Sequence, residues 1–171
     1  PKTFINKMDK AVAKRIVAYD GVSTARYELL QPGDQLEALS FPLMVKPYSE
    51  GTSIGISQKS KVHDLRELHE AVGMIHSRFN QPALVEEFLP GNEFTVGLIG
   101  NYVLPILKID FEKIPGQPVV RDPQVKDIEN PYISHLAWTD ESNRYAALAV
   151  IAHEALEARD YNRMDFRMRD E

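Results

Sequence analysis

The chain has 171 residues, of which 43% are hydrophobic and 26% charged, enough apolar material for one compact core or two small lobes. Its formal net charge of -5, from 20 Lys plus Arg against 25 Asp plus Glu, argues against a protein held on nucleic acid by overall charge. It has no cysteine, which excludes disulfides and thiolate metal sites, and no apolar run approaches the roughly 20 residues of a membrane span. We expect a cytoplasmic protein that binds neither nucleic acid nor a membrane.

The first half of the chain predicts two helices and several strands. The segment NKMDKAVAKRIVAYDG is typical of a helix, with four apolar residues near helical spacing: Met8, Val12, Ile16 and Val17. TARYELL, FPLMVKPY and SIGISQ each predict a strand. Asp64 is an N-cap candidate for a helix over DLRELHEAVGMIHSRF, and ALVEEFL then predicts an apolar strand that contains two carboxylates.

The second half begins with EFTVGLIG and YVLPILKID, which predict two strands joined as a hairpin by Gly100 and Asn101. Residues 111–139 contain four prolines and little periodicity, so we expect a long loop that carries function. ESNRYAALAVIAHEALEARD predicts a helix. In the final RMDFRMRDE, Met164, Phe166 and Met168 alternate with Asp165 and Arg167, as in a strand with one apolar face.

These two runs of mixed strand and helix, which meet near Gly91, predict two α+β lobes with a cleft between them. Charged residues on otherwise apolar strands are expected to point into this cleft, because burying them without a partner is costly. Seven residues fit that description: Lys46, Glu86, Glu93, Lys108, Asp110, Arg163 and Asp165.

Three segments, VKPYSEGTSIGIS, LVEEFLPGNEFTVGLIG and RMDFR, resemble in that order the ATP-grasp module of the D-alanine–D-alanine ligase family. The resemblance covers nearly the whole chain, and its most specific part runs from EEF to EFTV. It implies an α+β ATP-grasp fold, with lobe one in residues 1–92, lobe two in residues 93–171, and a nucleotide cleft between the lobes.

The resemblance also implies a nucleotide-binding site. In the family the phosphates are held by lysines that match Lys46 and Lys10, and a flexible loop matching residues 49–55 folds over the triphosphate. The implied nucleotide contacts are Lys10, Lys46, Glu50, Gly51, Thr52, Ser53, Glu86, Phe88 and Leu89, the last three at adenine, and Glu93 at the ribose. From the residues alone, each lysine could be a surface side chain, and the loop could be a glycine-assisted hairpin. Strand alternation predicts that Glu87 faces solvent.

The implied reaction phosphorylates the carboxylate of a first D-amino acid with ATP and lets the amine of a second attack the acyl phosphate. Asp165 matches a family ligand of Mg²⁺, and Arg163 matches the arginine that stabilises the transferring phosphoryl group. Lys126 matches the lysine of a mobile loop over the active site. The implied cofactors are ATP and Mg²⁺. Without the resemblance, Arg163 and Asp165 would be an ordinary ion pair on one strand face.

Two family segments have no counterpart in the 171 residues, an N-terminal domain and a C-terminal Glu-x-Asn motif with further metal ligands. The chain is therefore expected to be a fragment of a longer ligase, which makes D-alanyl-D-alanine for peptidoglycan, and the fragment is expected to bind ATP but to be inactive alone. Two alternatives stay open, an ATP-grasp ligase for other substrates and a non-catalytic nucleotide-binding module. We also expect a homo-oligomer, because missing strands would leave sheet edges unpaired.

Overall fold

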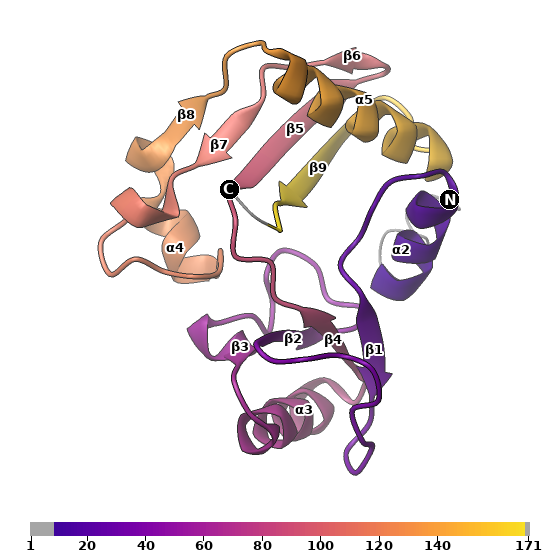
Figure 1. Cartoon of the computed structure of the whole chain (residues 1–171), viewed down its shortest axis with the longest axis vertical. Coiled ribbons are helices and arrows are strands. Elements are labelled where there is room, and N and C mark those ends of the chain that lie inside the picture. The colour runs from indigo at the N-terminus through magenta and orange to yellow at the C-terminus, as the bar shows by residue number, and fades with distance from the viewer. Residues whose placement is uncertain (1–8, 170–171) are drawn as a thin grey trace.

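A computed structural model describes residues 9–169 and shows two antiparallel sheets, each covered by a helix (Figure 1). The first sheet has the strand order β1-β4-β2-β3. Its elements are β1 (Tyr27–Leu30), β2 (Leu43–Pro47), β3 (Lys61–Val62), β4 (Ala83–Glu87) and the covering helix α3 (Leu65–Phe79). Leu68, Val72 and Ile75 of α3 pack on this sheet, as the helical spacing predicts.

The second sheet has the order β6-β5-β7-β8, and β9 pairs with the other edge of β5 along its whole length. Its elements are β5 (Glu93–Ile99), β6 (Tyr102–Val103), β7 (Leu107–Ile109), β8 (Ile133–His135), β9 (Tyr161–Arg167) and the covering helix α5 (Asp140–Ala155). Five residues, Phe88 to Asn92, connect β4 to β5 and thus join the two sheets.

Side-chain oxygens cap the helices, as the sequence predicts for Asp64, which accepts from the N–H of Glu67. Asp9 and Thr139 do the same for α2 (Lys10–Tyr19) and α5. Helix α2 contacts α5, while its side chains reach the first sheet, so it lies beside both parts (Figure 1). Met8, part of the predicted first helix, lies outside the described residues.

Strand alternation gives each sheet one apolar face and one face toward the other sheet. Val45 and Val85 face α3, which leaves Lys46 and Glu86 on the opposite face of the first sheet. In the second sheet, Phe94, Val96 and Leu98 pack against α5, together with Met164, Phe166 and Met168 of the last strand. The predicted alternation in RMDFRMRDE is therefore confirmed.

Three sequence predictions for local structure are wrong. SIGISQ is not a strand, because Ser53 and Gly55 have φ angles of 64° and 77° within a turn, and the helix η1 (Gln58–Ser60) begins at its last residue. YVLPILKID is not one strand but is divided into β6 and β7 around Pro105, which has no N–H for a ladder, although both pair with β5 as the predicted hairpin requires. The predicted loop after Phe111 contains three short helices and β8: η2 (Phe111–Lys113), α4 (Pro123–Ile128) and η3 (Asn130–Tyr132). Within residues 9–169, no helix has the length and hydropathy of a transmembrane segment.

Candidate functional site

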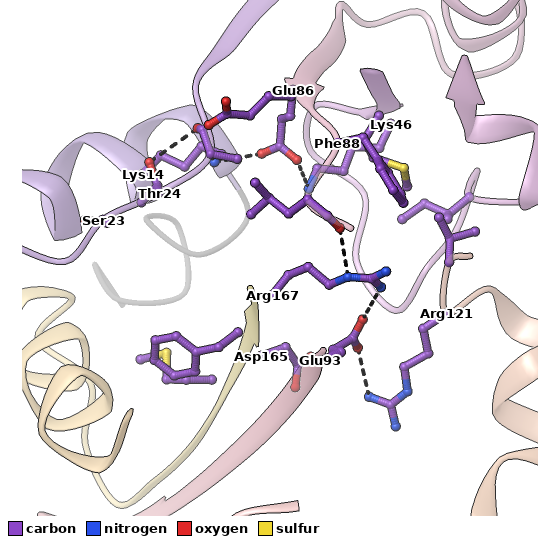
Figure 2. A pocket seen from close by; sticks show the side chains of 18 of the residues that line it. Lys14, Ser23, Thr24, Lys46, Glu86, Phe88, Glu93, Arg121, Asp165 and Arg167 are labelled. Carbon is purple, nitrogen blue, oxygen red and sulfur yellow. Dashed lines mark hydrogen bonds and ion pairs between the residues drawn. The ribbon is translucent and has the colours of Figure 1, made fainter. Parts of the chain in front are cut away.

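A cavity of about 430 Å³ lies between the two sheets (Figure 2). Strands β2 and β4 supply Lys46 and Glu86 from one side, and β5 and β9 supply Glu93, Asp165 and Arg167 from the other. Its volume lies in the ordinary range for small-molecule sites, and a cleft between two lobes is a common place for one.

The first-sheet wall contains one carboxylate between two ammonium groups. Glu86 accepts from Lys46, and its other oxygen lies 2.8 Å from Nζ of Lys14 on α2. The Glu86 side chain is only 6% exposed. Burial opposes its ionisation, but the charges of Lys46 and then Lys14 outweigh burial and hold the pKa of Glu86 below its usual value. Glu86 is thus a buried anion between two cations.

Lys10 lies behind this wall and outside the cavity. Its ammonium donates to the carbonyls of Pro47 (2.9 Å), Tyr48 (3.3 Å) and Glu50, the backbone that begins the predicted phosphate loop. Burial, followed by the positive charge of Lys46, lowers the pKa of Lys10 to about 8. The contacts of Lys10 therefore position the start of the loop.

The loop of residues 49–55 contributes one predicted contact residue, Ser53, to the cavity. The Ser53 hydroxyl donates to the carbonyl of Arg121 at 3.0 Å, which joins the loop to the second-sheet side. Glu50 instead accepts from Gln81 at 2.9 Å, and Gly51 and Thr52 are exposed and do not line the cavity. Ser53 is the residue of this loop that bridges to the facing segment.

We predict that Gly55→Ala destabilises the chain by about 1–3 kcal/mol. Gly55 has φ +77°, and an added Cβ would lie 2.5 Å from Cγ of Pro47 and 2.9 Å from the Phe79 ring. The matched control is Gly51→Ala, because a Cβ at Gly51 meets nothing within 4 Å. Urea unfolding of both variants checks this, and equal free energies of unfolding would contradict it.

The second-sheet wall carries two pairs of opposite charge. Glu93 is opposite Arg167 in the β5–β9 register, and Nη1 of Arg167 lies 3.4 Å from Oε2 of Glu93. Burial raises the pKa of Glu93, although the positive charges of Arg167 and Arg121 oppose this. Two residues along the strands, Asp165 accepts from the Thr95 hydroxyl at 2.9 Å and lies 3.3 Å from Nε of Arg163.

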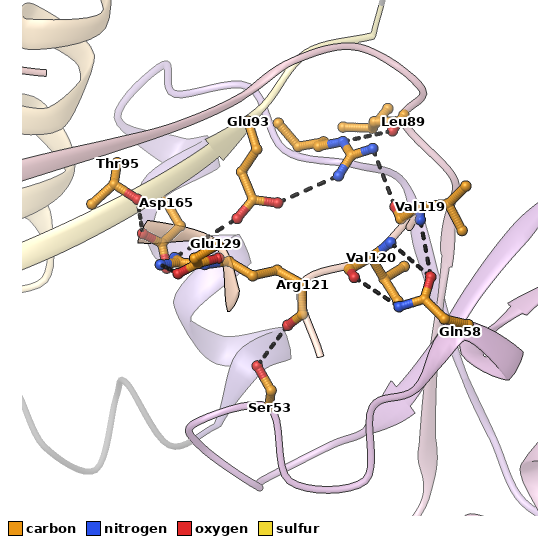
Figure 3. A network of polar contacts seen from close by, with 11 residues as sticks. Ser53, Gln58, Leu89, Glu93, Thr95, Val119, Val120, Arg121, Glu129 and Asp165 are labelled. Atoms are coloured by element: carbon orange, nitrogen blue, oxygen red, sulfur yellow. Dashed lines mark hydrogen bonds and ion pairs between the residues drawn. The ribbon is translucent and has the colours of Figure 1, made fainter. Parts of the chain in front are cut away.

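The connection after β7 closes a third side of the cavity (Figure 3). The guanidinium of Arg121 donates from Nε to both carboxylate oxygens of Glu129, at 2.9 and 2.7 Å. Gln58 of η1 accepts from the N–H of Val119 at 2.9 Å and donates to the carbonyl of Val120 at 2.9 Å. Arg167 of β9 donates to the carbonyl of Val119 at 3.3 Å, so the predicted functional loop contacts both η1 and the second sheet. Lys126 of α4 also lines the cavity, and burial lowers its pKa.

The Phe88 ring and the backbone of Leu89 line the cavity where the chain passes between the sheets. Phe88 lines the cavity, with the Lys61 ammonium 4.2 Å from its ring centroid. The carbonyl of Leu89 accepts from Nε of Arg167 at 3.0 Å. The Arg167 guanidinium lies 5.6 Å from the Phe88 ring centroid, so this end of the cavity has flat, stackable groups.

The prediction that Glu87 faces solvent is wrong. Its side chain is 9% exposed, because Arg169 covers it and donates two hydrogen bonds, at 3.0 and 2.7 Å. Glu87 also accepts from the backbone N–H of Arg26 at 2.9 Å. Alternation correctly turns Glu87 away from Glu86, but the Arg169 side chain, from the segment after β9, then reaches it.

We predict that Glu87 contributes a pH-dependent part of the stability. The Arg169 hydrogen bonds outweigh burial and lower the pKa of Glu87 from 4.5 to about 2. A lowered native pKa stabilises the fold above the unfolded value, and this contribution is lost as the pH falls from about 4.5 to about 2. Because Arg169 and Arg26 are 63% and 67% exposed, the effect is about 1 kcal/mol. Unfolding midpoints of Glu87→Gln and the unmodified chain should converge toward pH 2, and a constant difference would contradict this.

The predicted residues fall into two groups. The cavity is lined by eight of them: Lys46, Ser53, Glu86, Phe88, Leu89, Glu93, Lys126 and Asp165. Five do not line it: Lys10, Glu50, Gly51, Thr52 and Arg163, although Arg163 pairs with Asp165. Lys108 and Asp110, expected in the cleft, pair with each other at 3.3 Å outside the cavity. This part of the charged-residue prediction is wrong, because Lys108 is opposite Phe94 on the α5 face.

Sequence reasoning missed three cations of the cavity: Lys14, Arg121 and Arg167. Lys14 lies one helical turn after Lys10, and that spacing could have shown that the two share a face. Arg167 alternates with Asp165 on the strand, a pattern that places both on one face. Arg121 lies in a segment without periodicity and gave no signal.

Asp165 is the predicted metal ligand, and its oxygens are the kind of donor that Mg²⁺ prefers. Among the described residues, no three His, Cys, Asp or Glu side chains cluster as a metal site. A single carboxylate fits the usual way of holding Mg²⁺, in which one or two carboxylates act together with substrate phosphates.

Residues 10–171 match the family model described as D-ala D-ala ligase C-terminus. A D-alanine--D-alanine ligase of Pediococcus pentosaceus is 30% identical over 177 residues, covering 95% of this chain and 46% of that protein. The structure of the D-alanine--D-alanine ligase from Bacillus anthracis complexed with ATP is similar, with a TM-score of 0.72, 22% identity, and coverage of 95% of this chain and 52% of that chain. An L-amino acid ligase from Bacillus licheniformis has a TM-score of 0.70 and 22% identity, covering 97% of this chain and 38% of that chain. The chain spans about half the length of the curated relatives it matches.

Proposed function

The chain belongs to the D-alanine–D-alanine ligase family, and from this we propose that it forms the nucleotide-binding part of an ATP-dependent carboxylate-amine ligase. The family match and the similar structures confirm the predicted α+β ATP-grasp fold. The observation that carries the proposal is the cavity itself, with lysines on one wall and two carboxylates and arginines on the other. Such a site can hold a triphosphate and a cation together. The division into lobes at residues 92 and 93 is part of the proposal.

Each wall has a separate task in this proposal. Lys46 offsets phosphate charge, while Phe88, Leu89 and Glu86 receive the base and Glu93 accepts from the ribose hydroxyls. Lys10 keeps the phosphate loop in place by donating to three backbone carbonyls at the start of the loop, and Ser53 keeps the loop near Arg121. Glu50, Gly51 and Thr52 remain proposed contacts that depend on movement of this loop.

The second-sheet wall is the proposed place of phosphoryl transfer. The γ-phosphoryl group passes to a substrate carboxylate with release of ADP, and an amine then displaces phosphate from the resulting acyl phosphate. Arg163 stabilises the negative charge that develops in both steps, and Lys126 binds the transferred group from the α4 side. Asp165 would hold Mg²⁺, whose charge neutralises the phosphates when it is bound.

The substrates of the longer protein are also proposals. We propose D-amino acids, with D-alanyl-D-alanine formed for peptidoglycan, in the cytoplasm and in a homo-oligomer. In this account the described cavity residues act on the nucleotide and do not select the amino acids. A ligase for D-amino acids is therefore distinguished from a ligase for other substrates by assaying the longer protein with D-amino acids, L-amino acids and hydroxy acids.

We predict that this chain binds a non-hydrolysable ATP analogue more tightly with Mg²⁺ than without it, and that Asp165→Asn removes most of that difference. Calorimetric titration of each protein, with and without Mg²⁺, measures this. The matched control is Asp127→Asn, an exposed carboxylate of α4 outside the cavity. A folded chain that binds no analogue would overturn the nucleotide assignment, and an unchanged Mg²⁺ effect in Asp165→Asn would overturn the role of Asp165.

A further inference from the structure

The single negative charge of Glu86 is paired with two ammonium groups. Its two oxygens pair with different ammonium groups, Lys14 at 2.8 Å and Lys46 (Figure 2). One of these cations can move away without leaving Glu86 unpaired. The question that the geometry raises is which of the two moves and what the other one does.

Lys14 is held in place by two partners on different elements. Besides Glu86, its ammonium donates to the carbonyl of Ala25 at 2.9 Å, and it lies 5.5 Å from the Tyr27 ring centroid. The Lys14 side chain is 15% exposed. An ammonium has three donors, and these two partners among residues 9–169 take two of them.

Lys46 is less constrained. Glu86 is its one ion-pair partner among residues 9–169, and its side chain is 22% exposed. It stands at the end of β2, next to the loop that the proposed function places over the phosphates. Glu86 takes one of its three donors, and within the described part of the chain no partner is seen for the other two, which a flexible four-carbon stem lets turn toward the cavity.

Moving Lys46 would be costly if Glu86 had no second partner. A carboxylate that is 6% exposed and has lost its only cation is an uncompensated buried charge, a strongly unfavourable state. With Lys14 in place, Glu86 keeps an ion pair when Lys46 turns away. The cost of releasing Lys46 is therefore reduced by a residue that need not contact the phosphates.

We propose, on the basis of the proposed function, that Lys14 is a positioning residue that keeps Glu86 neutralised while Lys46 turns from Glu86 to the nucleotide phosphates. Lys14 thereby sets how much the phosphates add to affinity, and it has no effect on that quantity once Glu86 is uncharged. This second property separates Lys14 from a lysine that binds phosphate directly.

The experiment measures the affinity for ADP divided by the affinity for adenosine, because this ratio isolates the contribution of the phosphates. We expect Lys14→Met to lower this ratio about tenfold or more, since Lys46 then stays paired with Glu86. The double variant Lys14→Met/Glu86→Gln should recover most of the ratio, because Lys46 no longer has a carboxylate to neutralise. Glu86→Gln acts at the base end and weakens both ligands alike, so the ratio is insensitive to that loss.

Arg15→Met is the matched control, because it removes one charge from the same helix at an exposed position outside the cavity. Lys14→Gln is measured in parallel, so that the result does not depend on the folding of one variant, and circular dichroism checks each protein. An unchanged ratio in folded Lys14 variants would overturn the inference alone. A ratio that falls and is not recovered in the double variant would also overturn it, in favour of direct phosphate contact. Absence of ADP binding to the unmodified chain would instead overturn the proposed function.

Discussion

Arg121→Met is expected to lower the free energy of unfolding by about 3–5 kcal/mol. Arg121 forms a two-bond pair with Glu129, whose side chain is only 5% exposed. Truncating the guanidinium leaves the Glu129 carboxylate buried without its cation. The Arg121 carbonyl also accepts from Ser53, so a backbone shift at this position would move the phosphate loop as well. Urea unfolding followed by circular dichroism measures the change.

A second variant tests whether the buried charge is the cause. Arg121→Met/Glu129→Leu removes both charges, and we expect it to recover most of the lost stability, since apolar replacements of a buried pair are often neutral. Arg66→Met is the control for losing an arginine from an exposed ion pair, and should cause no measurable change. If the double variant is as unstable as Arg121→Met, packing of the Arg121 side chain would be the cause.

Glu86→Ala is expected to have a similarly large effect, about 3–5 kcal/mol, for the opposite reason. It leaves the ammonium groups of Lys14 and Lys46, 15% and 22% exposed, facing each other without an anion. Lys10 adds a third positive charge nearby. Urea unfolding measures the loss, with Glu70→Ala as a control because that carboxylate is 67% exposed.

Added anion should reverse this loss. A ligand that binds only the folded state stabilises it by mass action, about 2.7 kcal/mol at a hundredfold excess over its Kd. Tripolyphosphate should therefore raise the unfolding midpoint of Glu86→Ala more than that of the unmodified chain, because the variant has no internal carboxylate to compete for the lysines. An equal rise in both proteins would show that the anion does not bind between Lys14 and Lys46.

The sequence predicts the regular elements well where one face of each is buried. The spacing in α3, the alternation in β9 and the cap at Asp64 are local properties, and each is confirmed. One failure has a local cause, since Pro105 divides YVLPILKID, but others have non-local causes. SIGISQ has a strand-like composition, but Gly55 packs against Pro47 and Phe79, and the backbone turns there instead.

The candidate site divides in the same way. Residues that alternate on strands, such as Lys46, Glu86, Glu93 and Asp165, are found from the pattern and line the cavity. Glu87 could not be placed correctly, because Arg169 covers it from a segment 82 residues away. Arg121 was missed because its segment has no periodicity, whereas Lys14 could have been found from its helical spacing to Lys10, although its partner Glu86 lies on another element.

The long-range position of β9 has a consequence for the order in which the chain folds. Strands β1 to β4 lie within residues 27–87, and β5 to β7 within residues 93–109, so both groups can pair before the rest of the chain is in place. Strand β9 must instead close a long loop, since Thr95 and Asp165 are 70 residues apart. We expect the β5–β9 ladder to form in the final phase of folding. The two residues proposed for metal binding and phosphoryl transfer, Asp165 and Arg163, would then be the last to reach their places, and pulse-labelled hydrogen exchange would show their amides protected after those of β2 and β4.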